Sequence, residues 1–198
     1  MKNSICRIVA FCSATAFLAV AIPSCKNEDK AETEAFFPVL SFIGSQVAMV
    51  DTSLNSILRI TQVDSTRSDT VNIHREKFRE NAAEFLNLPD LSEKKYRDRY
   101  RSSKQFDQGL NLVILTFEAI RPEKELIHTE QVTIMPSIGG DKVRNIIINL
   151  VSNSRDSSVQ KRMLWNADQS FQVSTIKQLP GQPETSSSYK VTWNERKY

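Results

Sequence analysis

Apolar residues recur at three- and four-residue steps in two segments of the first half of the chain, which is the spacing of amphipathic helices. The first segment covers 36–50, and Pro38 falls where the first turn of a helix tolerates proline. The second covers 78–86 and ends before Pro89, because the residue that precedes a proline disfavours the α conformation. The pattern therefore predicts two helices.

The first predicted helix has two possible environments. A phenylalanine-rich helix can lie on a bilayer, or it can pack on a sheet. Its opposite face carries Ser41 and Ser45 rather than the basic residues typical of a membrane-surface helix. We therefore expect it to pack on a sheet.

Alternating or continuous apolar runs bounded by turn residues predict β-strands in the rest of the chain. They cover residues 57–63, 70–74, 110–117, 126–135, 143–151, 159–165, 171–176 and 189–193. The run 110–117 is apolar on both faces, which favours a central strand. Because the strands follow one another through short turns, we expect an α+β fold. The predicted architecture is a curled antiparallel β-meander of about six to nine strands, with the two helices packed on one face.

The first 24 residues are organised like an export signal. Lys2 and Arg7 supply positive charge, and the apolar run 8–22 that follows is short for a transmembrane helix. Ser24 directly precedes Cys25. This pattern resembles the lipobox of bacterial lipoproteins, in which the cysteine thiol is acylated and the chain is cleaved just before it. An uncleaved anchor and a secretory signal cleaved elsewhere are the alternatives.

The lipobox resemblance implies a division of the chain into three parts. Residues 1–24 are the signal peptide, 25–34 are a flexible polar tether, and 35–198 are a single globular domain. The sequence departs from the commonest lipobox at Ile22, where leucine is usual, and at Pro23.

The resemblance also implies a location. The expected protein is anchored to a membrane of the bacterial cell envelope, the outer membrane, through lipid on Cys25. Lys26 followed closely by Glu28 and Asp29 resembles the signal that sends Bacteroidetes lipoproteins to the cell surface. A periplasmic or a surface-exposed position both stay open.

The net charge and the cysteine content limit which partners and which chemistry we expect. The 198-residue chain has a net charge of +3, and removal of Lys2 and Arg7 leaves +1, so we expect no nucleic-acid partner. The signal contains Cys6 and Cys12, which leaves Cys25 as the one cysteine after cleavage. The basic segment 94–104 suits either an anionic lipid or glycan, or a solvated face beside a helix end, and we favour the solvated face.

Candidate chemistry is sparse. His74 falls at a junction between elements, while His128 and Glu130 are two residues apart in a predicted strand. On one sheet face such a pair forms either a weak site or a solvated polar pair, and the spacing matches no metal motif. A nucleophile elbow is also missing from the sequence. We therefore expect no metal, no cofactor and no enzymatic activity.

Two short segments resemble the O-glycosylation acceptor of Bacteroidetes envelope proteins. They place the candidate modified residues at Ser65 and Thr70. Three-residue motifs also arise by chance, which is the alternative interpretation.

Two functions fit these observations. The first is a membrane-anchored envelope lipoprotein with a non-enzymatic binding or assembly role, whose partner is an envelope protein. The alternative is a half-barrel carrier of lipid or another apolar ligand, because central strands that are apolar on both faces and an aromatic helix suit such a carrier.

Overall fold

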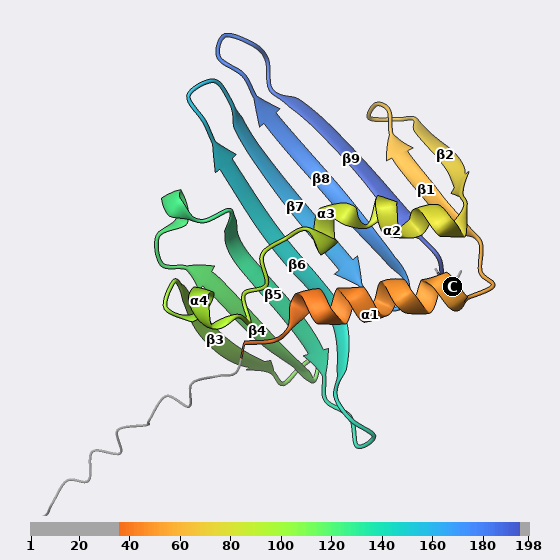
Figure 1. Ribbon diagram of the computed structural model, residues 1–198, viewed down its shortest axis with the longest axis vertical. Helices are drawn as coiled ribbons and strands as arrows, with labels where there is room; N and C mark the ends of the chain where they lie inside the picture. The colour runs from red at the N-terminus through yellow and green to blue at the C-terminus, as the bar shows by residue number, and fades with distance from the viewer. Residues whose placement is uncertain (1–35, 195–198) are drawn as a thin grey trace, which may run out of the picture. The chain divides into compact units, whose positions relative to one another are not determined.

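The computed structural model describes residues 36–194, which form a nine-stranded antiparallel sheet with short helices beside it (Figure 1). This confirms the predicted antiparallel sheet and its strand number. The strands are β1 (Ile57–Gln62), β2 (Ser68–Ile73), β3 (Tyr100–Asp107), β4 (Leu112–Ala119), β5 (Ile127–Met135), β6 (Lys142–Asn153), β7 (Ser158–Asn166), β8 (Ser170–Gln178) and β9 (Thr185–Thr192). The predicted signal, Cys25 and the tether lie outside the described residues.

The strand order is β2-β1-β9-β8-β7-β6-β5-β4-β3, so the sheet is open and has β2 and β3 at its edges. Strands β3 to β9 form the expected meander, in which each strand pairs with the next. The hairpin of β1 and β2 departs from it, because β1 pairs with β9. Strand β4 is second from an edge, so the prediction of a central strand at 110–117 is wrong. Both faces of β4 are apolar, and the strand is paired on both sides, but it does not lie in the middle of the sheet.

One strand carries no clear sequence signal. The basic segment 94–104 forms the single-turn helix α4 (Lys94–Arg97) and the first half of β3. Strand β3 has few apolar residues, so no alternation marks it. Charged side chains on an edge strand hinder pairing with another chain, which explains why this edge is polar.

The helices follow the sequence pattern in part. Helix α1 (Val39–Thr52) occupies the first predicted segment. The second predicted helix is broken into the 3-10 turn η1 (Arg75–Lys77) and the short helices α2 (Phe78–Asn81) and α3 (Ala83–Leu86). The break falls at Ala82, whose φ of −87° and ψ of 0° do not continue the α-helix. A second 3-10 turn, η2 (Pro122–Lys124), connects β4 to β5.

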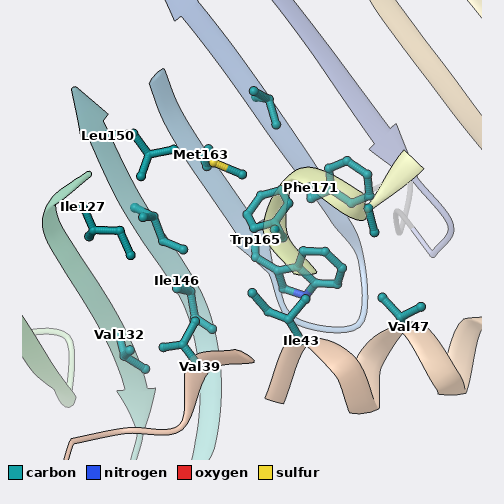
Figure 2. Close-up of a cluster of buried hydrophobic side chains, with 14 of the residues drawn as sticks. Val39, Ile43, Val47, Ile127, Val132, Ile146, Leu150, Met163, Trp165 and Phe171 are labelled. Atoms are coloured by element: carbon teal, nitrogen blue, oxygen red, sulfur yellow. The ribbon is translucent and has the colours of Figure 1, made fainter. Parts of the chain in front are cut away.

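Aliphatic and aromatic side chains together form the core between the helices and the inner strands (Figure 2). Trp165 of β7 is 0% exposed and stacks on Phe171 of β8, with ring centroids 5.2 Å apart. Phe85 of α3 meets these two rings edge-on at 5.1 Å and 5.4 Å. Ile43 and Val47 of α1 are buried in the same cluster. Large aromatic rings in such contacts supply much of the apolar area that stabilises a core.

Candidate functional site

A groove of about 690 Å³ opens where α1 begins, beside the turns that join β5 to β6 and β7 to β8. We call it the α1 groove. Its apolar lining comes from Phe37, Phe42, Met135 and Val143. The rings of Phe37 and Phe42 meet edge-on with centroids 5.9 Å apart. Its volume falls in the range of ligand pockets.

An apolar row runs from the α1 groove to the edge of the sheet. The strand registers pair Phe106 with Val113, Val113 with Ile134, and Ile134 with Val143, which places these side chains in one line across β3 to β6. Ile134 and Val143 pack against the core, whereas Phe106 is 52% exposed. The row therefore carries apolar surface from the core to solvent at one corner of the sheet.

Gln46 of α1 holds the wall of the groove in place. Its Nε2 donates a hydrogen bond to Oδ1 of Asp168 at 2.9 Å, and its Oε1 accepts one from the Asp168 backbone N–H at 2.7 Å. Asp168 lies in the turn between β7 and β8 and has a φ of +59°, a left-handed conformation that aspartate tolerates better than most residues. The paired bonds fix α1 against this turn.

Two cations stand beside the apolar lining. Lys142 and Arg144 line the groove, and the backbone carbonyl of Arg144 accepts a hydrogen bond from the N–H of Ala167 at 3.1 Å. Neither side chain forms an ion pair with another residue of 36–194. The lining contains no histidine or cysteine. Apolar rings next to free cations suit contact with an amphiphile rather than acid–base chemistry.

The sheet face that points away from the core carries mostly uncharged polar side chains, and we call it the outer face. One row of paired residues crosses all nine strands: Ser103, Thr116, Gln131, Ile147, Leu164, Gln172, Lys190, Ile60 and Thr70. Neighbouring side chains bond to one another on this face. Asn149 Nδ2 donates to Thr129 Oγ1 at 2.7 Å, and Gln172 Nε2 donates to Ser188 Oγ at 3.2 Å. The outer face thus offers amides and hydroxyls over the width of the sheet.

A polar cluster joins α3 to the strands. Tyr189 of β9 donates a hydrogen bond to Glu84 Oε1 at 2.9 Å, and Lys161 of β7 forms an ion pair with Glu84 Oε2. Burial alone would raise the pKa of Glu84, but the hydrogen bonds from Lys161 and Tyr189 outweigh it and hold the pKa below its usual value. The Arg59 guanidinium lies 4.0 Å from the centroid of the Tyr189 ring. These contacts hold α3 against β7 and β9, so the role of the cluster is structural.

Glu130 is the one buried acid among residues 36–194. It is 2% exposed, pairs with Phe117 and Ile148 on the neighbouring strands, and its Oε1 has no hydrogen-bond partner among the described residues. Burial in the apolar core, with a smaller effect of the Asp90 charge, raises the pKa of Glu130 to about 8. The acid is therefore mostly protonated at neutral pH.

The expectation of a solvated polar pair at His128 and Glu130 is wrong for Glu130. A β-bulge shifts the register of β5 between Ile127 and Thr129. Across a bulge the alternation of side chains is interrupted, so a two-residue spacing no longer implies one shared, solvated face. His128 is half-buried, and His74 precedes η1 without forming a side-chain cap to it.

The candidate modification sites lie apart from the groove. Ser65 is exposed in the turn between β1 and β2, and Thr70 is exposed on edge strand β2. Both hydroxyl groups are thus accessible in the described part of the chain. The candidate lipidation site, Cys25, lies outside it.

In residues 36–194 no group of His, Cys, Asp and Glu side chains is arranged to hold a metal ion. None of the helices in this range has the length and apolar character to cross a membrane. Comparisons with protein families, with curated proteins and with solved structures each find no match.

Proposed function

We propose that this protein is a lipid-anchored component of the bacterial cell envelope with a non-enzymatic binding or assembly role. Acyl chains on Cys25 hold it at the outer membrane, after removal of 1–24, and the polar residues 25–34 link the domain to this anchor. The lipobox-like stretch before Cys25 and the single cysteine left after cleavage support this proposal.

The binding surface in this proposal is the outer face of the sheet, whereas α1, α2 and α3 pack over part of the other face. The single observation that carries it is the filled helix side, where Trp165, Phe171 and Phe85 pack with exposures of 0–1%. A filled interior leaves no room for a cargo between helices and sheet. The amides and hydroxyls of the outer face suit hydrogen bonding to an envelope protein.

A carrier of lipid or another apolar ligand is the second candidate, and the α1 groove is the observation that favours it. Native mass spectrometry of the delipidated mature protein distinguishes the two functions. Co-purified lipid supports the carrier, whereas a mass equal to that of the polypeptide supports the binding module.

The anchor is tested in cells that express the wild type and a Cys25→Ala variant. We expect the mature wild type to carry acyl mass on Cys25 and to fractionate with membranes, and the variant to lose both properties. A wild-type protein that retains residues upstream of Cys25 overturns the proposal. Protease treatment of intact cells then separates a surface position, which is cleaved, from a periplasmic one.

The binding role is tested by site-specific photocrosslinking. A photoreactive amino acid at Gln131, in the middle of the outer face, is compared with one at Lys177, near the end of β8 on the helix side. We expect a discrete crosslinked partner from Gln131 alone. Equal crosslinking from both positions contradicts a specific outer-face interface.

A further inference from the structure

We propose that one corner of the domain, formed by the β3–β4 turn, the β5–β6 turn and the α1 groove, rests on the surface of a lipid bilayer. We call it the membrane corner. This inference rests on the proposed lipid anchor at Cys25, and it adds an orientation: the domain lies against the membrane with a defined face.

Exposed apolar side chains gather at this corner. Ile138, in the β5–β6 turn, is fully exposed, and Leu110, in the β3–β4 turn, is 66% exposed. Met135 and Phe106 stand beside them at the ends of β5 and β3 and are 40% and 52% exposed. Strands β4 and β5 pair directly, so these two turns are neighbours at the same end of the sheet. Apolar side chains grouped on adjacent turns mark an interaction site, whereas single ones do not.

Two of the turns at the other end of the sheet are polar, whereas the β4–β5 connection there exposes Ile120 and Leu126 by 52% and 47%. The β6–β7 turn carries Arg155 and Asp156, and the β8–β9 turn carries Gln182 and Glu184. The two ends therefore differ in what they offer to a bilayer. At the membrane corner the apolar tips continue into an apolar row that leads into the core.

The described part of the chain begins beside the α1 groove. Phe36 stacks on Phe117 of β4 with ring centroids 4.7 Å apart, and Phe37 lines the α1 groove. Ten residues separate Phe36 from Cys25. At full extension these span at most about 40 Å, so the anchor keeps the start of the domain within that distance of the lipid surface.

The charges of the corner suit an interfacial position. Lys142 and Arg144 lie at the start of β6, next to the turn that contains Ile138 and close to Met135 at the end of β5. Neither cation has an ion-pair partner among residues 36–194. Basic side chains beside apolar ones place their charge at lipid phosphates while the apolar tips enter the boundary of the acyl region. The groove lining also contains Asp141 and Asp168, so its formal charges balance and the apolar tips carry the interaction. The occupant of the membrane corner is thus a phospholipid bilayer.

The test is tryptophan fluorescence of the full mature protein in vesicles of phosphatidylethanolamine and phosphatidylglycerol. An Ile138→Trp variant is compared with a Gln182→Trp variant, which places the same reporter on a turn at the opposite end. The native Trp165 and Trp193 are buried and give a constant background. Vesicles with brominated acyl chains quench a tryptophan that enters them.

For Ile138→Trp we expect emission shifted to shorter wavelength and loss of the added emission in brominated vesicles, with neither effect for Gln182→Trp. Flotation with vesicles and the acyl mass on Cys25 are measured on the same samples. Acylated protein that floats without quenching of Ile138→Trp overturns the membrane corner and leaves the anchor standing. Equal quenching of both variants also overturns it, because the domain then has no preferred face. Protein without acyl mass that does not float overturns anchor and corner together.

Discussion

Gln46 and Asp168 exchange two hydrogen bonds across 122 positions of the chain, and they join the middle of α1 to the turn between β7 and β8. Gln46 is buried, whereas Asp168 is exposed. The pair holds one wall of the α1 groove and sets where α1 crosses the sheet.

A Gln46→Ala substitution should lower the free energy of unfolding by about 1–3 kcal/mol, because it leaves the Asp168 N–H without its partner. Urea denaturation of the variant and the wild type measures the change. Gln105→Ala is the matched control, because Gln105 is exposed on edge strand β3 and its change should stay within about 0.5 kcal/mol. Equal losses for the two variants would mean that the bonds to Asp168 contribute nothing.

Tyr189 and Glu84 provide a second contact between the helical segment and the sheet, joined at 2.9 Å. Tyr189→Phe, Glu84→Ala and the double variant form a cycle whose coupling energy isolates this bond. We expect a coupling energy of about 1 kcal/mol at neutral pH, because the acceptor, the Glu84 carboxylate, is charged but half-exposed. Because the folded-state pKa of Glu84 is lowered, the coupling is present above the usual carboxylate range and is lost as the pH falls through the folded pKa. A coupling that stays constant into acid would contradict an ionised Glu84.

Asn111 has a φ of +52° in the turn between β3 and β4, a region that favours glycine and tolerates asparagine. Asn111→Val should cost about 1–2 kcal/mol, because a β-branched side chain clashes with the backbone there. Asn111→Gly at the same position keeps the conformation and should cost much less. Thermal unfolding of the two variants gives the comparison, and a valine variant as stable as the glycine variant would show that the turn adopts another conformation.

The sheet was predictable because its strands alternate or stay apolar between clear turns, as in β6 and β7. The pairing of β1 with β9 could not be predicted, because no local sequence pattern indicates which edge of the sheet a distant hairpin joins. Edge strand β3 was missed because it exposes charges such as Lys104 where a buried strand would carry apolar residues. The break of the second helix at Ala82 was missed as well, since Phe78 and Phe85 keep helical spacing across it.

The candidate site depends on contacts between distant segments, and the sequence holds little trace of them. Phe37, Val143 and Asp168 share the α1 groove only because α1 crosses the ends of β5 to β8. The sequence gives one sign of an exposed apolar corner, which is the apolar residue Ile138 inside the turn 136–141. The burial of Glu130 was hidden by the bulge beside His128, because a bulge has no fixed sequence signature.

Glu130 places an ionisable group under the rings of Phe117 and Phe36, which stack on each other. The folded state raises the pKa of Glu130 from the ordinary 4.5 to about 8, so the folded protein binds this proton more tightly than the unfolded chain does. Between pH 4.5 and about pH 8, Glu130 loses its proton in the unfolded chain but keeps it for the most part in the folded protein. The free energy of unfolding should therefore fall as the pH rises across that window, by up to about 1.4 kcal/mol per pH unit.

A Glu130→Gln variant should lose that dependence and become more stable than the wild type near pH 8, because an amide has no charge to bury. Urea denaturation from pH 5 to pH 8 measures the slope for both proteins. Glu118→Gln is the matched control, since Glu118 is exposed on the adjacent strand β4 and its replacement should leave the slope unchanged. If Glu130→Gln keeps the wild-type slope, the carboxyl group of Glu130 reaches water in the folded state. If the slope disappears, a neutral acid in the core makes this domain most stable at the acidic end of the window.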